Sequence, residues 1–421
     1  MLEVHAGDVY SGELFRGTTP GRKTYVFGYN ETCPAAGSVS LTMPVMRDQY
    51  VYPEVLHPIF DMNLPEGELA EKIKRQFRKA VERFDDLDFL RIVGQSQIGR
   101  LRFVAPDAPA ADVPALSLKE ILVHDGAADL FDDLLARYAV HSGISGVQPK
   151  VMVRDDESPV DRVTHRGATH IVKAWNPDSY PFLAENEFFC MTAARHAQID
   201  VPDFQLSHHG KFLVIDRFDR VEDRYLGFED FCVLNGLPVE EKYSGSYENV
   251  TKRIKQFVSP SEVRPALEQF FKSLALSCAV QNGDAHLKNF GVVYDDPEGI
   301  VKLSKAYDIV STTPYLPSDS LALTLGGSKR FPKAKALLAF GRTHCGFSES
   351  LVRGLLAEVA EGMLRAADSL RVHMRDRPEF AEIGGKMLQV WNAGINCSLR
   401  FDDTPVSVMA LTANEGKPEP A

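Results

Sequence analysis

The sequence predicts an α+β fold divided into more than one compact unit. Its 421 residues exceed what a single hydrophobic core usually organises, so two or three units are expected. Short strands and turns dominate the first hundred residues, whereas amphipathic helices dominate the chain beyond residue 226. The segment between them mixes strands with a helix, which is typical of a sheet covered by a helix on one face.

An N-terminal α+β subdomain is predicted over residues 1–105. Strand and turn patterns appear in EVHAGDVYSGELFRG (3–17), GRKTYVFGYN (21–30) and GSVSLTMPV (37–45), followed by a helical stretch at 65–84 and a strand near 99–106. Residues 106–116 are predicted to be a linker, because the segment is rich in proline, alanine and aspartate and has no hydrophobic period.

A second unit is predicted over residues 117–225. A helical pattern at 118–140 leads to the turn HSGISGVQPK (141–150), and the order after it is strand, strand, helix, strand, strand. We expect the helix in this series, LAENEFFCMTAARHAQ (183–198), to pack on one face of an antiparallel sheet.

The remainder, residues 226–411, is predicted to be mainly helical. In RPALEQFFKSLALSCAVQNGD, apolar side chains recur at helical spacing and mark one buried face, at Leu267, Phe270, Phe271, Leu274 and Cys278. Two short strands follow, and then amphipathic helices over 333–373 and 378–398. Residues 412–421 are expected to form a loose tail.

Composition narrows the class of protein. With 44% hydrophobic and 25% charged residues, the chain has the composition of a soluble globular protein. No apolar run reaches the length of a membrane helix and the first residues lack a signal-peptide pattern, so we expect a cytoplasmic protein without a membrane partner. Six scattered cysteines suggest neither a zinc site nor a disulfide framework. The net charge of −11 disfavours nonspecific nucleic-acid binding.

A dense group of polar residues, QNGDAHLKNFGVVYDD (281–296), lies between an apolar helix and a strand. Asp284 and Asn289 are five positions apart there, the separation at which protein kinases carry a catalytic Asp and a metal-binding Asn. Two short strands later, Asp308 in AYDIVST is placed to reach the same metal. Mg²⁺ favours a few protein oxygens together with phosphate oxygens, which suits this set.

Upstream residues supply the other requirements of phosphoryl transfer. Lys173 lies in the middle of the apolar strand HIVKAW, where a charge needs an anionic partner. Glu185 and Glu187 follow near the start of the next helix, which suggests the Lys–Glu ion pair of a kinase small lobe. Before them, the glycines of GISGVQPK offer backbone N–H groups to phosphates, with Lys150 at the end of the turn.

Each candidate also has an ordinary structural explanation. The turn at 284–289 fits a cap or an Asx turn, and Asp308 fits the N-cap of a helix. Lys173 fits a side chain that extends from an edge strand to water, and residues 185–187 fit first-turn charges that complement the helix dipole. His286 alone, without metal-ligand spacing, fits a structural role. The occurrence of all these residue types in kinase order favours the functional explanation.

At this point the residues strongly resemble the HipA family, the serine/threonine-kinase toxins of bacterial toxin–antitoxin pairs. The resemblance covers nearly the whole chain through LPEGELAEKI, GVQPK, HIVK, LAENEFFCM, FLVIDRFDR, FEDFCVLNGLPVEEKY, GDAHLKNFGV and AYDIVST. It implies a protein-kinase-like bilobal fold with an additional N-terminal β-rich subdomain. Residues 117–225 would be the small lobe and residues 226–411 the large lobe.

The resemblance also implies roles for individual residues. Lys173 would hold the phosphates of ATP, Glu187 would anchor the small-lobe helix, and Asp216 and Phe218 would form the hinge against the adenine. The turn residues that would bind the nucleotide are Ser145, Gly146, Val147, Gln148 and Lys150.

The catalytic loop follows the same correspondence. Asp284 would be the catalytic carboxylate, with His286 beside it, and Asn289 and Asp308 would bind Mg²⁺.

One departure from the family pattern concerns autophosphorylation. Well-known members carry an inhibitory phosphoserine at the position occupied here by Gly143, while Ser145 and Ser142 lie nearby. Some relatives carry serine at the place of Ser145, and phosphate there would oppose nucleotide binding. We therefore expect Ser145 to be the autoregulatory site, with Ser142 as the alternative.

The resulting hypothesis is an ATP- and Mg²⁺-dependent serine/threonine protein kinase that acts as a toxin. The resemblance implies a protein substrate of translation, such as an aminoacyl-tRNA synthetase, and a helix-turn-helix antitoxin of the HipB type that contacts operator DNA. Two alternatives remain open: a small-molecule kinase of the aminoglycoside or choline type, and a catalytically silent corepressor or scaffold.

Overall fold

The computed structural model describes residues 1–17, 23–77, 84–106, 108, 112–124, 129–156, 167–175, 179–222, 224–402 and 406–408. Contacts divide the chain into unit 1, formed by 1–188, 202–267 and 286–307, and unit 2, formed by 189–201, 268–285 and 308–421. Within the described ranges, every helix is too short or too polar to cross a membrane. The predicted tail at 412–421 and part of the predicted linker lie outside the described residues.

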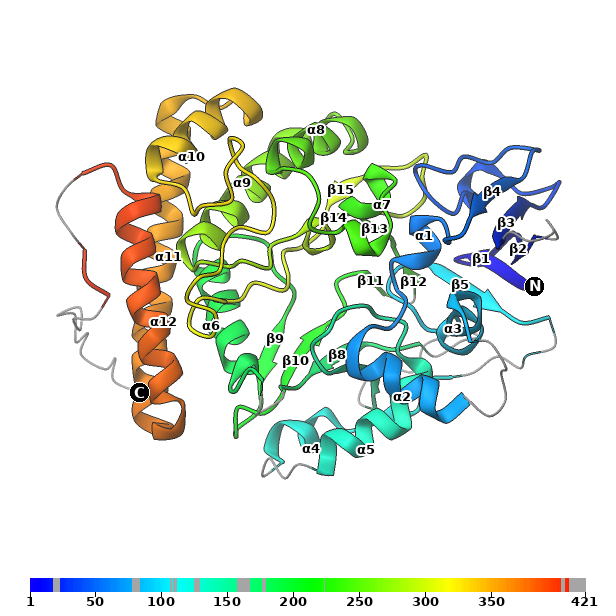
Figure 1. The fold of residues 1–421 in the computed structure, drawn as a ribbon, viewed down its shortest axis with the longest axis horizontal. Coiled ribbons are helices and arrows are strands. Elements are labelled where there is room, and N and C mark those ends of the chain that lie inside the picture. The colour runs from blue at the N-terminus through cyan, green and yellow to red at the C-terminus, as the bar shows by residue number, and fades with distance from the viewer. Residues whose placement is uncertain are drawn as a thin grey trace. The chain divides into compact units, whose positions relative to one another are not determined.

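Unit 1 begins with a five-stranded antiparallel sheet in the order β4-β3-β2-β1-β5 (Figure 1). Its strands are β1 (Leu2–Ala6), β2 (Val9–Arg16), β3 (Thr24–Tyr29), β4 (Tyr50–Pro53) and β5 (Leu101–Val104). Alternate residues of β1 are buried, as a half-covered strand requires. Gly7 adopts a positive φ of 61° in the two-residue turn between β1 and β2, a conformation that favours glycine.

Three helices follow β4 in the chain, α1 (Pro58–Asp61), α2 (Gly67–Phe77) and α3 (Asp86–Val93), and α3 packs against β5 of this sheet. The ring of His57 accepts a hydrogen bond from Ile59 N–H at the start of α1. Asp85 and Asp88 form a capping box at the start of α3, which satisfies backbone N–H groups that a helix start leaves open. The predicted helix at 65–84 therefore corresponds to α2 up to Phe77, and residues 78–83 lie outside the described part.

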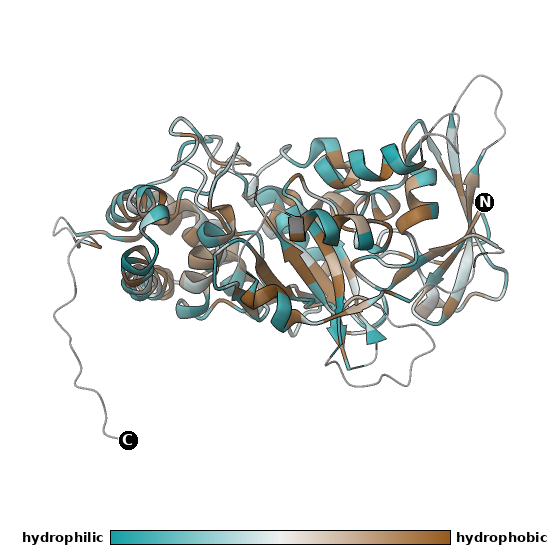
Figure 2. Cartoon of the chain, turned by 90° about the horizontal axis from the view of Figure 1, so that it is seen from below, coloured by the Kyte–Doolittle hydropathy of each residue, from teal (hydrophilic) through white to brown (hydrophobic). Residues whose placement is uncertain are grey.

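The second sheet of unit 1 has the order β6-β7-β8-β10-β9, parallel only between β6 and β7. Its strands are β6 (Ala115–Leu116), β7 (Lys150–Asp155), β8 (His170–Lys173), β9 (Phe204–Leu206) and β10 (Leu213–Asp216). The helices that lie between these strands in the chain are α4 (Leu118–Val123), α5 (Asp129–Tyr138) and α6 (Leu183–His196), and α6 belongs to unit 1 as far as Phe188. The sequence of β7, β8, α6, β9 and β10 has the predicted order. Figure 2 shows the strands mainly in the colour of apolar residues, whereas the helices carry polar surface along one side.

A third sheet, β13-β14-β15, carries the strand that follows the polar segment at 281–290. Its strands are β13 (Gly227–Asp230), β14 (Gly291–Tyr294) and β15 (Lys302–Leu303), and a small ribbon is formed by β11 (Arg220–Val221) and β12 (Arg224–Tyr225). Asp230 caps α7 (Phe231–Asn235) by accepting Val233 N–H, and α8 (Tyr247–Phe257) follows. Short 3-10 turns occupy Val239–Glu241 and Leu287–Asn289.

Unit 2 is helical. Its elements include the C-terminal part of α9 (Val263–Ala279), α10 (Ala334–Phe340), α11 (Glu349–Asp376) and α12 (Ala381–Gly394). Ser348 caps α11 through Leu351 N–H, and α11 and α12 lie side by side (Figure 1). Gly362 of α11 permits close packing against the residue after α6, because a Cβ at position 362 would lie 2.5 Å from the nitrogen of Ala197. Trp391, Phe271 and Phe380 fill the interior of this unit.

Candidate active site

A buried ion pair joins Lys173 at the end of β8 to Glu187 in α6. The Lys173 Nζ atom lies 2.6 Å from Glu187 Oε1, and the two side chains are 5% and 0% exposed. A lysine inside an apolar sheet is stable as a charged group only with such a partner, because burial otherwise penalises the ammonium strongly. The structure therefore brings together two residues that the sequence placed 14 positions apart.

Glu185, the other acidic candidate of this helix, has a different environment. It is 0% exposed, and Gly210 lies directly against it, because a Cβ at Gly210 would approach the Glu185 carboxylate. Gly210 has a φ of +65° in the turn between β9 and β10, so both the turn and the contact favour glycine. Spacing alone left Glu185 and Glu187 equivalent, whereas the ion pair selects Glu187.

The turn at 143–149 leads into β7 and is stabilised by hydrogen bonds of its own residues. Gly146 has a φ of +115°, and Lys150 Nζ donates to the carbonyl oxygen of Ser145 at 3.1 Å. Gln148 Nε2 donates to the carbonyl oxygen of Ala174, just beyond β8, at 3.1 Å. Val147 is 68% exposed at the tip. Four of the predicted nucleotide-binding residues, Ser145 to Gln148, thus lie in this turn, and Lys150 is the first residue of β7.

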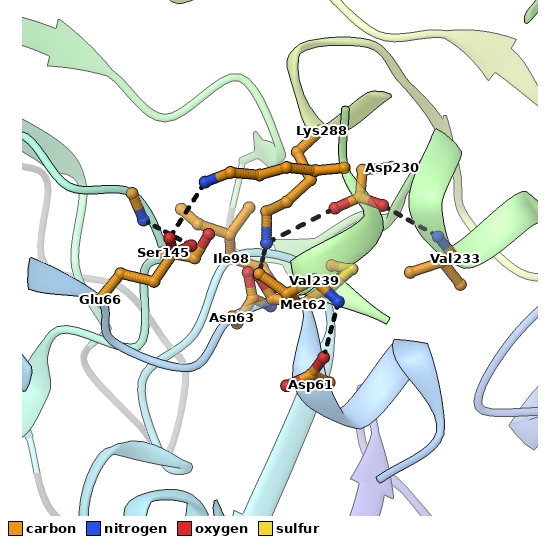
Figure 3. Close-up of polar contacts among 12 residues, drawn as sticks. Asp61, Met62, Asn63, Glu66, Ile98, Ser145, Asp230, Val233, Val239 and Lys288 are labelled. Carbon is orange, nitrogen blue, oxygen red and sulfur yellow. Dashed lines mark hydrogen bonds and ion pairs between the residues drawn. The ribbon is translucent and has the colours of Figure 1, made fainter. Parts of the chain in front are cut away.

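The two candidate serines of this loop differ in accessibility. Ser142 is 0% exposed, and its hydroxyl donates to Tyr138 O at 2.7 Å and accepts from Met152 N at 2.9 Å. Ser145 is only half-buried and lies near Glu66 (Figure 3). A hydroxyl that is fully buried and engaged twice is not available as a phosphate acceptor without local opening.

The predicted hinge residues lie at and just after the end of β10. The Asp216 Oδ1 atom is 3.2 Å from His170 Nε2 on the neighbouring strand. Phe218 stacks on Tyr307 with ring centroids 5.3 Å apart and also contacts Phe228 at 5.4 Å. The ring of Phe218 is therefore packed among protein side chains.

Part of the polar segment belongs to unit 1. His286 is 8% exposed and its ring lies edge-on to Tyr243 at 5.0 Å, and Asn289 is 7% exposed. Tyr307 donates its hydroxyl proton to the carbonyl oxygen of Lys288 at 2.7 Å. The short turn Leu287–Asn289 is thus held in a defined conformation directly before β14.

The other part belongs to unit 2. Asp284 N donates to Asn282 Oδ1 at 2.9 Å, which is an Asx turn. Thr312 N donates to Gln281 O at 3.2 Å, and the nitrogen of Gly283 donates to the Thr312 hydroxyl at 2.9 Å. The chain just after Asp308 therefore runs alongside the chain just before Asp284.

Asp308 itself has a positive φ of 55°, an uncommon conformation for a residue other than glycine. The residues after it form no helix, so the N-cap explanation of this aspartate is wrong. Uncommon backbone conformations of this kind cluster at functional sites, where surrounding contacts maintain them.

The metal candidates are an amide and a carboxylate. Among the described residues, no group of three or more His, Cys, Asp and Glu side chains is close enough to hold a metal by itself. Asn289, in unit 1, and Asp308, in unit 2, offer two oxygen ligands of the type that Mg²⁺ prefers when phosphate oxygens complete its shell. The residue types present therefore fit a magnesium–nucleotide complex.

Three polar residues of unit 1 received no role from the sequence. Lys288 Nζ lies 2.7 Å from Met62 O and 3.9 Å from Asp230 Oδ2 (Figure 3). Lys242 Nζ lies 3.1 Å from Glu66 Oε2. Lys242, Lys288 and Glu66 all fall within the segments that carry the family resemblance. Their inclusion in those segments marked all three, and Lys288 also belongs to the polar segment at 281–296.

Comparison with known proteins identifies the family. A family model of the HipA-like C-terminal domain matches residues 142–367, and a model of the HipA N-terminal domain matches residues 2–104.

Two curated relatives come from Sinorhizobium fredii. "Putative kinase Y4dM" is 30% identical over 336 residues, covering 74% of this chain and 76% of the relative. "Putative kinase Y4mE" is 28% identical over 289 residues, covering 64% of this chain and 67% of the relative.

A solved structure is similar across almost the whole chain. It belongs to a complex of the Shewanella oneidensis toxin–antitoxin system HipA, HipB and its operator DNA, with a TM-score of 0.70 and 20% identity, covering 94% of this chain and 97% of that one. The match confirms the predicted fold class, an α+β fold with a β-rich N-terminal subdomain. Since its family model spans more than half of the chain, the protein belongs to the HipA family.

Proposed function

We propose that the protein is an ATP- and Mg²⁺-dependent serine/threonine protein kinase and the toxin of a bacterial toxin–antitoxin pair. The observation that carries the proposal is the buried pair of Lys173 and Glu187 at 2.6 Å. Buried ion pairs seldom add net stability compared with apolar packing, so their presence favours a functional explanation. Kinases use such a pair to hold a lysine against ATP phosphates. The descriptions of the two Sinorhizobium relatives point the same way.

Separate parts of the chain would bind the phosphates and the adenine of ATP. Lys173, oriented by Glu187, would hold the nucleotide phosphates, and the turn at 145–150 would cover them with backbone N–H groups. The backbone at 216–218 would face the adenine, with Asp216 and Phe218 shaping that segment. Because Phe218 already stacks on Tyr307, its contribution would be to hold the hinge in place.

Asp284 would orient the acceptor hydroxyl and receive its proton as the acceptor oxygen bonds to the γ-phosphorus and the bond from that phosphorus to the β-phosphate oxygen breaks, releasing ADP. Asn289 and Asp308 would hold Mg²⁺. The bound Mg²⁺ would neutralise phosphate charge that develops during transfer. His286, packed against Tyr243, would maintain the conformation of the loop that carries Asp284 and Asn289.

The acceptor would be a serine or threonine hydroxyl on a protein of translation, such as an aminoacyl-tRNA synthetase. The partner would be a small helix-turn-helix antitoxin of the HipB type, and contact with operator DNA would pass mainly through it. The net charge of −11 supports this division, since an acidic surface repels the phosphate backbone. The similar Shewanella structure contains HipA, HipB and operator DNA.

Autophosphorylation would occur at Ser145. Its loop position supports this choice, and the buried, doubly bonded hydroxyl of Ser142 disfavours the alternative. Mass spectrometry after incubation with Mg·ATP tests the assignment, and a phosphate located only at another residue contradicts it.

The decisive experiment is expression of the protein with and without Asp284→Ala. We expect growth arrest with the unaltered chain and normal growth with the variant at equal protein level. Arrest that persists with Asp284→Ala excludes the kinase explanation.

Two further assays separate the alternatives. Labelled γ-phosphate transferred from ATP to a lysate protein supports a protein kinase, whereas label found only on small molecules supports the aminoglycoside or choline type. Absence of Mg·ATP binding in calorimetry supports a silent scaffold.

A further inference from the structure

The N-terminal subdomain reaches the predicted nucleotide-binding turn through the segment LPEG (64–67), between α1 and α2. Gly67 has a φ of +55°, and a Cβ on it would lie 2.8 Å from the Val147 carbonyl oxygen and 3.1 Å from its Cα. The backbones of the two segments are therefore in direct contact. Only glycine fits this position without displacing the turn.

The carboxylate of Glu66 lies at the same contact. Its Oε1 accepts the N–H of Gly146 at 3.2 Å, and its Oε2 accepts from Lys242 Nζ at 3.1 Å. The side chains of Glu66 and Lys242 are 22% and 13% exposed, so the pair is largely shielded from solvent. Burial raises the pKa of Glu66, but Lys288, Lys242 and a hydrogen bond from Ser145 together lower it below the usual value.

Lys242 extends this connection to the catalytic loop. Its carbonyl oxygen accepts the N–H of Leu287 at 3.1 Å, so a single residue bonds Glu66 with its side chain and the 286–289 turn with its backbone. The next residue, Tyr243, packs its ring against His286. The conformation of residues 239–243 is thus tied to the loop that carries Asn289.

The N-terminal subdomain also contacts the segment 239–243 at a second point. Asp61 accepts the N–H of Val239 at 3.1 Å, at the start of the short turn that leads to Lys242. On the other side of the same cluster, Lys288 donates to the carbonyl oxygen of Met62. Residues 61–67 therefore contact both the nucleotide-binding turn and the catalytic loop.

We propose that Glu66 and Lys242 are positioning residues that couple the turn at 145–150 to the loop at 286–289, so that the N-terminal subdomain sets the geometry of the kinase site. The proposal rests on the proposed function for its effect on ATP. Glu66 does not act on the nucleotide: its two oxygens are engaged by Gly146 and Lys242, and it works through the loop that it holds.

Hydrogen exchange measured without nucleotide tests the coupling directly. With Glu66→Gln, which retains an acceptor but loses the charge, we expect faster amide exchange in both 143–150 and 284–290. The matched control is Glu68→Gln, because Glu68 is exposed two positions further along the chain. Faster exchange confined to residues around 66, with both loops unchanged, overturns the proposal.

Calorimetric titration with Mg·ATP measures the consequence for binding. We expect roughly tenfold weaker binding for Glu66→Gln and for Lys242→Met, and no further loss in the double variant, because each substitution breaks the same connection. Additive losses overturn the coupling. Tighter Mg·ATP binding in Glu66→Gln also overturns it, since the carboxylate would then be an inhibitor that competes with phosphate.

These two measurements distinguish failure of the inference from failure of the proposed function. If the unaltered protein binds no Mg·ATP, the kinase proposal fails, while hydrogen exchange still decides whether Glu66 couples the two loops. A Glu66→Asp variant that restores slow exchange in both loops supports a positional role.

Discussion

The ammonium group of Lys288 lies 2.7 Å from the carbonyl oxygen of Met62, although the two residues are 226 positions apart in the sequence. Lys288 belongs to the turn directly before β14, and Met62 follows α1 of the N-terminal subdomain. The same ammonium lies 3.9 Å from Asp230, which caps α7. One lysine thus connects three segments of unit 1, and its contacts lead to the first prediction.

Lys288→Met should destabilise the fold by about 1.5–3 kcal/mol, the usual loss for a hydrogen bond that involves a charged group. The side chains of Lys288 and Asp230 are 9% and 3% exposed, so solvent replaces the lost contact poorly. Urea unfolding measures the change. Lys302→Met is the control, because Lys302 is exposed on β15, and an equal effect of both substitutions contradicts the specific role of Lys288.

Lys173→Met should cost about 3–5 kcal/mol of stability, because it leaves the Glu187 carboxylate buried without its cation. Adding Glu187→Leu should recover most of this stability, since an apolar pair avoids the desolvation penalty. Mg·ATP binding should remain lost in both variants. Chemical unfolding measures the stability, and calorimetry measures Mg·ATP binding. Recovery of nucleotide binding in the double variant would show that Lys173 does not hold phosphate.

Glu229 should make stability depend on pH. It is 0% exposed, and burial raises its pKa to about 7, although hydrogen bonds from Ser40, Tyr294 and Leu41 N–H lower it in part. The unfolded chain therefore ionises this carboxyl first as pH rises. The stabilisation that the protonated group provides is complete below pH 4.5. It is lost as the pH rises to about 7, which lowers the free energy of unfolding by on the order of 3 kcal/mol.

Glu229→Gln keeps a neutral hydrogen-bonding side chain and should flatten this part of the profile. Urea unfolding at a series of pH values between about 4 and 8 provides the measurement. Asp61, whose pKa burial also raises to about 7, contributes a slope of the same sign that should remain in the variant. An identical pH profile in both proteins contradicts the assignment to Glu229.

Ser145→Asp should weaken Mg·ATP binding, because a new negative charge beside Glu66 repels that carboxylate and releases the turn. Hydrogen exchange in residues 143–150 should accelerate at the same time. Ser145→Ala should lose autophosphorylation and weaken Mg·ATP binding less than Ser145→Asp does, because it removes one hydrogen bond to Glu66 but adds no charge and leaves the backbone N–H groups in place. Unchanged binding by Ser145→Asp would separate the serine from nucleotide binding.

Ser142→Ala should lower the stability of the protein, unlike the two substitutions of Ser145. Its hydroxyl makes two buried hydrogen bonds, to Tyr138 O and from Met152 N, so the loss should be about 1–3 kcal/mol of stability. Autophosphorylation per folded molecule should be unaffected. Loss of the phosphate in Ser142→Ala, with Ser145 intact, would assign the modification to Ser142.

Local patterns predicted much of the architecture. Alternating and helical periodicities indicated the strand order around β1, β2, β3 and β5 and the series β7, β8, α6, β9 and β10. The strand expected at 37–45 is wrong, because that stretch forms turns and an isolated bridge between Ser40 and Met43, and β4 was not predicted. Spacing indicated a lysine with a carboxylate partner on the following helix. Spacing did not distinguish Glu185 from Glu187, because both lie within the first turns of α6. The choice depends on which side chain faces β8, and that depends on how the helix packs.

By itself, the sequence determined the fold class, the family and the residue types of the proposed site, because period and motif order are properties of neighbouring residues. Only the tertiary structure decided that Glu66, Lys242 and Lys288 connect the N-terminal subdomain to the two loops. The physical reason is that these contacts join segments from 80 to 226 positions apart. The packing of whole sheets and helices determines which distant segments meet, and no pattern among neighbouring residues predicts these meetings.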